Sequence, residues 1–343
     1  MRVLSVSSRL ILRWCQTASV VVVWLSCAAV PAKDTGRLIG NAPIPRASVS
    51  EAAREAPEGR APLVQLDFDN VSVVSSPKGA GKFDILRMKG GSSLLAEAAI
   101  QYEAGDDNDR RARIVPDPVR KNNQVLQYWL KHARVPGERK GHFKGRIQLN
   151  LANINKTEIY ERHRMYLHPD LGLYRSYPKE NHWFTISTLW IGQNNRPNPF
   201  KISLNIVKEN GVGKPLYFMA TGDMRIGGKP RHGKWKNVWG KVNTDFQVPL
   251  GEWFDVEMGY KQGDGKSGRY YLGVKRESDV SMIPIFDIAD WTYNPKSPEP
   301  IPLTNWNPFK LYTSDEVIDF IREKGGVAQI YWDDLEISER WPN

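Results

Sequence analysis

The chain has 343 residues and a formal net charge of +10, with 41% hydrophobic and 25% charged residues. Its two cysteines, Cys15 and Cys27, both lie near the amino terminus. The rest of the chain can therefore form no disulfide, thiolate nucleophile or cysteine-ligated metal site, and its stability has to come from a large core.

Residues 1–32 have the features of a secretory signal peptide. Three arginines and no acidic residue precede an apolar run at 18–25, and small residues follow it. We therefore expect a secreted or periplasmic protein with no membrane span in the mature chain. An uncleaved anchor is the first alternative, but the run is short for a span. A lipoprotein anchored at Cys27 is the second, although Trp24 stands where such signals usually have Leu.

Residues 33–62 are rich in Ala, Pro, Arg and Glu and show no apolar periodicity. This composition predicts a disordered linker. Residues 63–343 then form one domain, because all-β domains often reach this length.

Period-2 alternation of apolar and polar residues recurs through this domain and predicts strands. The predicted strands are Leu63–Phe68, Gly145–Leu151, Thr157–Leu167, Trp183–Ile191, Lys201–Lys208, Leu216–Thr221, Gly251–Tyr260, Arg269–Arg276 and Ala328–Ile337. Gly-, Asn- and Pro-rich turns separate them, which favours an all-β antiparallel β-sandwich of the jelly-roll, concanavalin-like type. We expect its first and last strands to lie close together.

Helix is predicted in only two segments, Ser92–Tyr102 and Ser314–Lys324. In the second, Ser314 is a suitable N-cap and two acidic residues follow it at the positive end of the helix dipole.

The most polar predicted strand is Lys156–Tyr166. Alternation places six side chains on one of its faces: Lys156, Glu158, Tyr160, Arg162, Arg164 and Tyr166. Arginines can clamp a sugar carboxylate and tyrosines can stack on the ring, so this face suits an anionic sugar. The alternative is a solvated outer face with cross-strand ion pairs.

Five segments in order resemble the concanavalin-like polysaccharide lyases, the family that includes alginate lyases and heparin lyase I. They are Lys156–Tyr160, Trp183–Trp190 with Asn198–Ile206, Gly251–Val256, Phe309–Tyr312 and Gln329–Leu335. The resemblance spans 63–340. It implies an exported enzyme that cleaves an acidic, uronate-containing polysaccharide by β-elimination, with the strands of the site side by side in one sheet.

Elimination needs a group that neutralises the carboxylate, a base and an acid. Arg162 is the candidate neutraliser, and Tyr312 or His163 the candidate base or acid. His163 falls on the opposite face from the arginines if the strand is regular, where a buried structural histidine is the alternative. The predicted substrate-binding residues are Glu158, Tyr160, Arg164, Trp190, Gln193, Asn205 and Lys310.

One departure from the family concerns its Gln-x-His strand. The matching positions here are Thr188 and Trp190, which cannot supply the family's amide and histidine base. Gln193, His163 and His182 lie nearby in sequence and offer a substitute set.

The same residues also allow other functions. A noncatalytic carbohydrate-binding protein on the same fold is the main alternative, and a structural cell-surface protein is a weaker one. A pair of carboxylates at retaining-glucanase spacing is missing from the sequence. The moderate, scattered positive charge and the predicted export favour an acidic polysaccharide over nucleic acid as partner. We expect a monomer.

The spacing of the histidines does not match a metal site. We expect no cofactor. Calcium in an oxygen-rich loop such as 105–109 is the alternative. Four of the twelve tryptophans stand in polar segments predicted as loops, and could line the edge of a sugar-binding cleft. They are Trp235, Trp239, Trp291 and Trp306.

Overall fold

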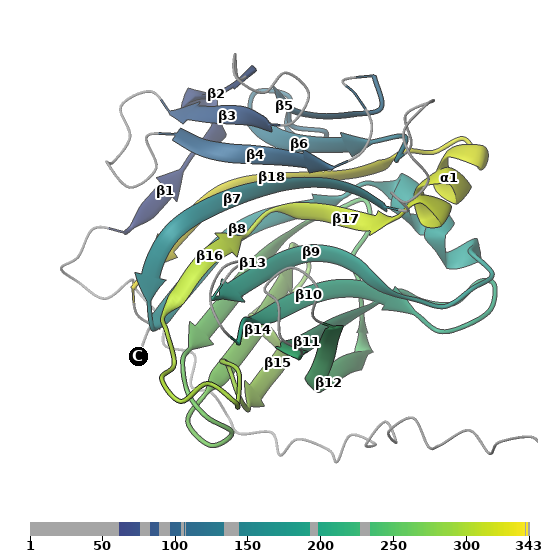
Figure 1. Cartoon of the computed structure of the whole chain (residues 1–343). Helices are drawn as coiled ribbons and strands as arrows, with labels where there is room; N and C mark the ends of the chain where they lie inside the picture. The colour runs from purple at the N-terminus through teal and green to yellow at the C-terminus, as the bar shows by residue number, and fades with distance from the viewer. Residues whose placement is uncertain are drawn as a thin grey trace, which may run out of the picture. The chain divides into compact units, whose positions relative to one another are not determined.

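Two antiparallel β-sheets form the described part of the chain in the computed structural model (Figure 1). The structure describes residues 62–75, 83–88, 97–103, 106, 108–133, 144–192, 198–226, 234–339 and 341. The predicted signal peptide with Cys27, the predicted linker up to residue 61, and Gln193 lie outside the described residues. No helix in the described ranges is both long enough and apolar enough to cross a membrane.

The first sheet, sheet A, runs in the order β15 (Ile283–Ala289), β14 (Arg269–Arg276), β13 (Trp253–Lys261), β8 (Glu158–Leu167), β18 (Ala328–Ser338), β6 (Gln124–Leu130) and β5 (Arg110–Pro116), with β1 (Val64–Leu66) paired to β18. The second, sheet B, runs in the order β12 (Lys234–Gln247), β11 (Tyr217–Ile226), β10 (Phe200–Lys208), β9 (Asn181–Ile191), β16 (Leu303–Asn307), β7 (Lys144–Lys156), β4 (Glu97–Glu103), β3 (Phe83–Met88) and β2 (Val71–Ser75). In sheet B, β17 (Lys310–Ser314) pairs with β7 and β9. Two 3-10 turns, η1 (Phe68–Asn70) and η2 (Pro169–Ser176), and one α-helix, α1 (Asp315–Glu323), connect strands.

The core lies between the inner faces of the two sheets. Trp332 of sheet A is fully buried and stacks on Phe309, whose ring centroid is 5.1 Å away in the turn between β16 and β17 of sheet B. Tyr128 on β6 meets the same indole at 4.6 Å. Burying a large apolar side chain in this way contributes about 1.5–3 kcal/mol each. The prediction of an antiparallel β-sandwich is confirmed, and so is the expected closeness of its first and last strands, since β1 pairs with β18.

One of the two helix predictions is confirmed. Helix α1 begins after Ser314, whose hydroxyl accepts a hydrogen bond from the Val317 amide at 3.3 Å. The other predicted helix, Ser92–Tyr102, is wrong over the residues that the structure describes, because Glu97–Glu103 forms the strand β4. Ala98 and Ile100 alternate into the core from this strand. Ala and Glu favour helices and are depleted in strands, so the composition of this segment predicted a helix despite the alternation.

The chain crosses from one sheet to the other between β7 and β8. Only Thr157 separates these strands, yet β7 belongs to sheet B and β8 to sheet A. Asn153 and Asn155 in the last part of β7 have positive φ angles of 59° and 52°. Asn tolerates this left-handed conformation better than most residues, which allows the strand to bend before it changes sheets.

Candidate functional site

Sheet B presents a polar outer face. Its strands bury residues such as Ile147, Leu204 and Leu311 in the core, so the alternate residues point away from it. We call this surface the polar face and define it by Glu103, Lys144, Arg146, Gln148, Trp183, Thr185, Thr188, Trp190, Lys201, Ser203, Asn205, Asp223, Arg225, Trp235, Lys310 and Tyr312. Within this set, four cations and the buried amine of Lys310 accompany two carboxylates.

Lys310 lies at the centre of the polar face with only 3% of its surface exposed. Its Nζ donates a hydrogen bond to Thr188 Oγ1 at 3.1 Å and lies 5.1 Å from the ring centroid of Tyr312 and 6.0 Å from that of Trp190. Burial, reinforced by the nearby cations Arg146 and Lys201, holds the pKa of Lys310 well below its usual value. The environment therefore favours the neutral amine.

Tyr312 is half-buried beside Lys310 and contacts a second lysine. Lys144 Nζ lies 5.5 Å from its ring centroid, and the Trp183 ring meets it edge-on at 5.1 Å. Burial opposes charge on Lys144, but Tyr312 and Glu103 together raise the pKa of this lysine above its usual value. Lys144 therefore remains a cation next to the phenol.

Arg146 and Glu103 complete this end of the face. Glu103 lies 3.1 Å from Lys144 Nζ and 3.6 Å from Arg146 Nη1. Arg146 Nε is buried and has no hydrogen-bond partner among the described residues. A buried donor without an acceptor costs about 1–3 kcal/mol, while the Arg146 side chain as a whole keeps 27% of its surface exposed.

Asn205 and Thr188, both singled out in the sequence, are held by hydrogen bonds on the same face. Thr185 Oγ1 donates to Asn205 Oδ1 at 2.8 Å, and Thr188 accepts from Lys310 as described above. Trp190 donates through Nε1 to Asn307 Oδ1 at 2.9 Å. The structure thus brings together four of the predicted site residues: Trp190, Asn205, Lys310 and Tyr312.

The other predicted site residues that the structure describes lie elsewhere, on β8. The prediction that they share a sheet with Lys310 and Tyr312 is wrong, because β8 pairs with β13 and β18 in sheet A. Alternation along one strand fixes which side chains share a face, but not which sheet the strand joins. On the outer face of sheet A, this strand presents Glu158, Tyr160, Arg162 and Arg164.

On that face of sheet A, the arginines of β8 form ion pairs with acidic side chains. Arg162 Nε lies 3.6 Å from Glu257. Arg164 lies 3.6 Å from Asp255 and 3.5 Å from Glu277. The alternative of an outer face with cross-strand ion pairs therefore describes β8 better than an anion-binding surface does.

His163 points into the core, on the opposite face from the arginines as the alternation predicted. Its Nδ1 lies 2.8 Å from Glu161 Oε1, and both side chains are fully buried. The ring packs edge-on against Phe309 at 5.4 Å. A polymer bound to either outer face cannot contact this pair.

The tryptophans predicted to lie in loops divide into two groups. Trp235 and Trp239 belong to β12 and Trp306 to β16, and of these only Trp235 is exposed. Trp291 does lie between strands, where its carbonyl accepts a hydrogen bond from Trp239 Nε1 at 2.7 Å. The segment around Trp235 and Trp239, predicted as a loop, is thus part of the edge strand β12, whose many charges are typical of such strands.

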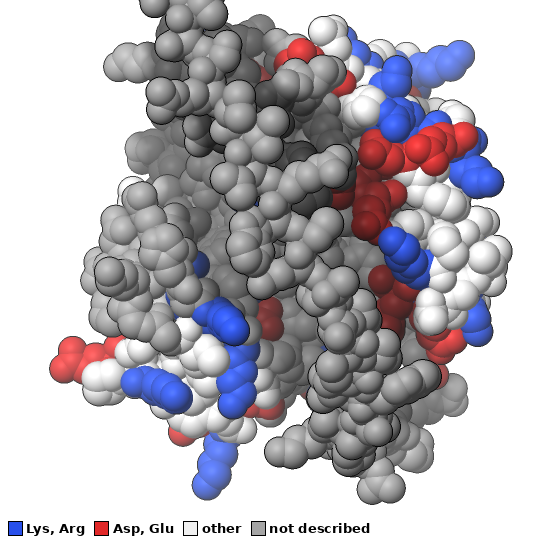
Figure 2. Space-filling view, turned by 45° about the vertical axis from the view of Figure 1, so that its right-hand side comes forward, with Lys and Arg blue, Asp and Glu red and all other residues white. Residues whose placement is uncertain are grey.

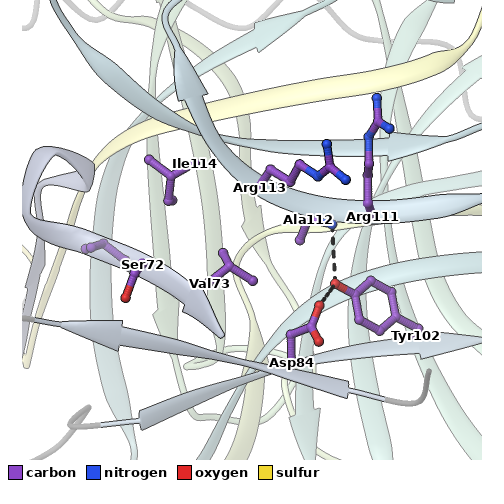
Figure 3. Close-up of a pocket in the computed structure, with 9 residues that line it drawn as sticks. Ser72, Val73, Asp84, Tyr102, Arg111, Ala112, Arg113 and Ile114 are labelled. Carbon is purple, nitrogen blue, oxygen red and sulfur yellow. Dashed lines mark hydrogen bonds between the residues drawn. The ribbon is translucent and has the colours of Figure 1, made fainter. Parts of the chain in front are cut away.

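Two hollows lie away from the polar face. Figure 3 shows the first, at the open edge of the sandwich, where Tyr102 of β4 points toward β5. Its hydroxyl donates to Asp84 and accepts from the Ala112 amide. Burial, followed by Asp84, raises the pKa of Tyr102. The second hollow, on sheet A, is lined by the paired residues Arg164, Asp255 and Glu277 among others.

Among the residues that the structure describes, no group of three or more His, Cys, Asp or Glu side chains is placed to hold a metal ion. The expectations on calcium and on cofactors stay predictions.

No protein-family model and no curated protein matches the sequence. The fold is similar to solved structures of polysaccharide lyases. A variant of alginate lyase Aly36B, in complex with an alginate tetrasaccharide, is 11% identical with a TM-score of 0.47, over 82% of this chain and 98% of that chain. An endo-β-1,4-glucuronan lyase from the fungus Trichoderma reesei is 12% identical with a TM-score of 0.40, over 70% and 94%.

A third similar structure is an exolytic alginate lyase from Zobellia galactanivorans. It is 10% identical with a TM-score of 0.37, over 80% of this chain and 96% of that chain. At these identities the likeness concerns the fold alone, and the chemistry has to be argued from the residues of this chain.

Proposed function

We propose that the polar face of sheet B binds an acidic, uronate-containing polysaccharide outside the cytoplasm and cleaves it by β-elimination. The observation that carries the proposal is the cluster at one end of this face. There the Tyr312 ring lies near Lys144 and Lys310, and the partly exposed Arg146 stands opposite it on β7.

The charge and aromatic content of the polar face support an anionic sugar as ligand. Its cations exceed its carboxylates, since Lys144 and Arg146 share Glu103, whereas each arginine of β8 on sheet A has a carboxylate of its own. Trp183 and Trp235 are the most exposed aromatic residues of the described chain, each 36% exposed, and both lie on this face. Exposed indole rings offer flat surfaces for sugar rings. Figure 2 shows basic and acidic side chains next to one another among the described residues at its right-hand side.

The chemistry can be assigned to named groups. Arg146 neutralises the uronate carboxylate, which makes the C5 proton more acidic. Tyr312 acts as the phenolate: its oxygen takes that proton and becomes the phenol, the electron pair forms the C4–C5 double bond, and the C4–O bond breaks. The leaving oxygen then takes a proton from Tyr312. The Lys144 cation stabilises negative charge on the phenol oxygen during the transfer, and the buried Lys310 positions the ring.

A noncatalytic binding protein is the second candidate, and two observations favour it. Lys310 is almost fully buried, so it cannot contact a polymer directly. Thr188 and Trp190 occupy the positions where the resembled lyases have an amide and a histidine.

The variant Tyr312→Phe separates the two candidates. It keeps the ring and its contacts with Trp183 and the lysines but removes the hydroxyl. For a lyase, we expect binding of the substrate polymer to change by less than about twofold and turnover to fall by about 10²–10⁴-fold, the usual contribution of a proton-transfer group. The ultraviolet absorbance of the unsaturated product measures turnover, and calorimetric titration measures binding.

Tyr271→Phe on the outer face of sheet A is the matched control and should leave both quantities unchanged. The parent chain is first screened against a panel of uronate polymers. If it binds one of them but releases no unsaturated product from any, the binding-protein function holds. If it binds none, the polar face has another ligand and the proposal is wrong.

A further inference from the structure

The second end of the polar face carries a separate cluster around Trp235. Its indole ring lies 4.9 Å from Lys201 Nζ and 5.1 Å from the Arg225 guanidinium, measured from the ring centroid. The three residues come from β12, β10 and β11, which are neighbours in the sheet, and Arg225 pairs directly with Trp235 across the ladder. Hydrogen-bonded strands hold this arrangement, which favours a preformed site.

The charges of this cluster are incompletely matched. Asp223 is its carboxylate, and it lies 3.5 Å from Lys201 Nζ. It already accepts hydrogen bonds from Thr221 and Asn237. Arg225 Nε, like Arg146 Nε at the other end, is buried without a hydrogen-bond partner among the described residues. Two positions on one face therefore have a guanidinium Nε without an acceptor among the described residues, and Arg225 lies beside the exposed Trp235.

Trp190 connects the two ends. Its ring lies 5.8 Å from that of Trp235 and 6.0 Å from Lys310 Nζ. Its Nε1 donates to Asn307 and its carbonyl accepts from Thr304, so its position is fixed from both sides. A ligand that extends from Tyr312 toward β12 would pass over this ring.

We infer that Trp235, Lys201 and Arg225 form an accessory subsite for a second acidic sugar unit of the same chain. The inference rests on the proposed function and assigns a second sugar-binding position to this end of the polar face. The exposed part of the indole packs against a sugar ring, and the two cations contact its carboxylate. No bond is made or broken at this subsite; it lengthens the segment of polymer that the protein holds.

Affinity for uronate oligosaccharides of increasing length tests the subsite in the full chain. Trp235→Ala should weaken binding of a long oligosaccharide by about tenfold, which corresponds to ~1.4 kcal/mol. The loss should be smaller for a disaccharide, which cannot occupy both ends. Arg225→Gln should also weaken binding of the long ligand and reduce its dependence on salt, because one ionic contact is removed.

Trp341→Ala is the matched control. Its indole also lies beside an arginine, with Arg269 at 4.7 Å, but in sheet A, so this variant should bind like the parent. Circular dichroism and thermal midpoints show whether each variant is folded, and Arg225→Gln gives an independent reading if Trp235→Ala is not.

Three outcomes would overturn the inference. If the parent binds a uronate polymer and both variants bind it equally well at every length, the subsite is wrong while the proposed function stands. If the variants lose affinity for a neutral glucan as much as for the uronate, the anionic part of the inference is wrong. If the parent binds no uronate ligand of any length, the proposed function and the subsite fail together.

Discussion

Lys310 shows how a single residue combines charge, burial and position on the polar face. A lysine almost without exposed surface is unusual unless it has partners, and here these are one hydroxyl and two aromatic rings. The hydrogen bond to Thr188 offsets part of the cost of burying the amine. Such a lysine keeps the neighbouring side chains in place while other groups contact the ligand.

The lowered pKa of Lys310 makes stability depend on pH. The folded chain holds this proton less tightly than the unfolded chain, where the usual value is 10.5. Between the lowered pKa and 10.5, the unfolded chain binds more protons, so the free energy of unfolding rises with pH. We therefore expect the parent to gain stability relative to Lys310→Met as pH increases across this window.

Denaturant unfolding of both proteins at several pH values measures this difference. Lys214→Met removes a lysine whose side chain is 43% exposed, and its difference from the parent should stay flat. A flat difference for Lys310→Met as well would show that the lysine is charged and solvated in the folded chain.

At the scale of elements, the two outer faces differ in how their strands distribute charge. Strand β8 meets β13 residue by residue, so that Arg162 stands opposite Glu257 and Arg164 opposite Asp255. In sheet B, β7 and β17 place Arg146 opposite Tyr312 and Lys310 opposite Gln148, and β4 places Glu103 opposite Arg146. Lys144 and Arg146 therefore share one carboxylate, whereas Arg162 and Arg164 each face a carboxylate of their own.

Arg146→Ala and Arg162→Ala test this contrast with the same chemical change on opposite sheets. Arg146→Ala should weaken binding of the uronate polymer by about 1.5–3 kcal/mol, the usual contribution of a hydrogen bond to a charged group. Arg162→Ala should leave it unchanged, since its partner Glu257 is on the same surface. The reverse result, measured by titration, would support the role predicted for Arg162 from the sequence.

The sequence predicted much of the strand content but not the sheet assignments. Alternation identified β8, β9 and β10, because core residues such as Ile159 and Ile202 recur at every second position. It could not show that Thr157 lets the chain cross sheets, since that depends on long-range pairing. The sequence also predicts a loop at the start of β12, because lysines suit a loop as well as an edge strand.

The candidate site was predicted only in part for a related reason. The motif around Tyr312 pointed to the right strand, and Asn205 and Trp190 joined it as expected. Arg146, Lys144 and Arg225 were missed, because they are single cations in otherwise ordinary alternating strands. Their place in the candidate site depends on neighbouring residues that are distant in sequence.

At the scale of the whole molecule, the core of the sandwich contains a pair of polar groups. Glu161 and His163 both face inward from β8, toward Phe309 of the opposite sheet. The pair is fully buried, so its two members stabilise each other where water cannot. A sandwich without disulfides depends strongly on such a core.

Removing one member of this pair should destabilise the whole domain. His163→Leu leaves the Glu161 carboxylate buried without its partner, and we expect a loss of about 3–5 kcal/mol in the free energy of unfolding. The double variant with Glu161→Met should recover much of this, because apolar groups then fill the space. Urea unfolding measures both.

The exposed pair of Arg269 and Asp287, in contact at 2.7 Å, serves as comparison. Arg269→Ala should cost about 0–1 kcal/mol, as exposed pairs usually do. If His163→Leu costs no more than this, the buried pair is not a determinant of stability.

The hydrogen bonds of Tyr102 occupy part of an outer edge of sheet A. β5 is the outermost strand of sheet A, and an outermost strand offers free amides to which a second copy can add its own strand. The Ala112 amide is already occupied by the Tyr102 hydroxyl, and the Arg110 guanidinium covers that ring at 4.3 Å. An incoming strand would have to displace Tyr102, whose hydroxyl is held by Asp84. We expect this requirement to hinder fibrillar aggregation through the β5 edge.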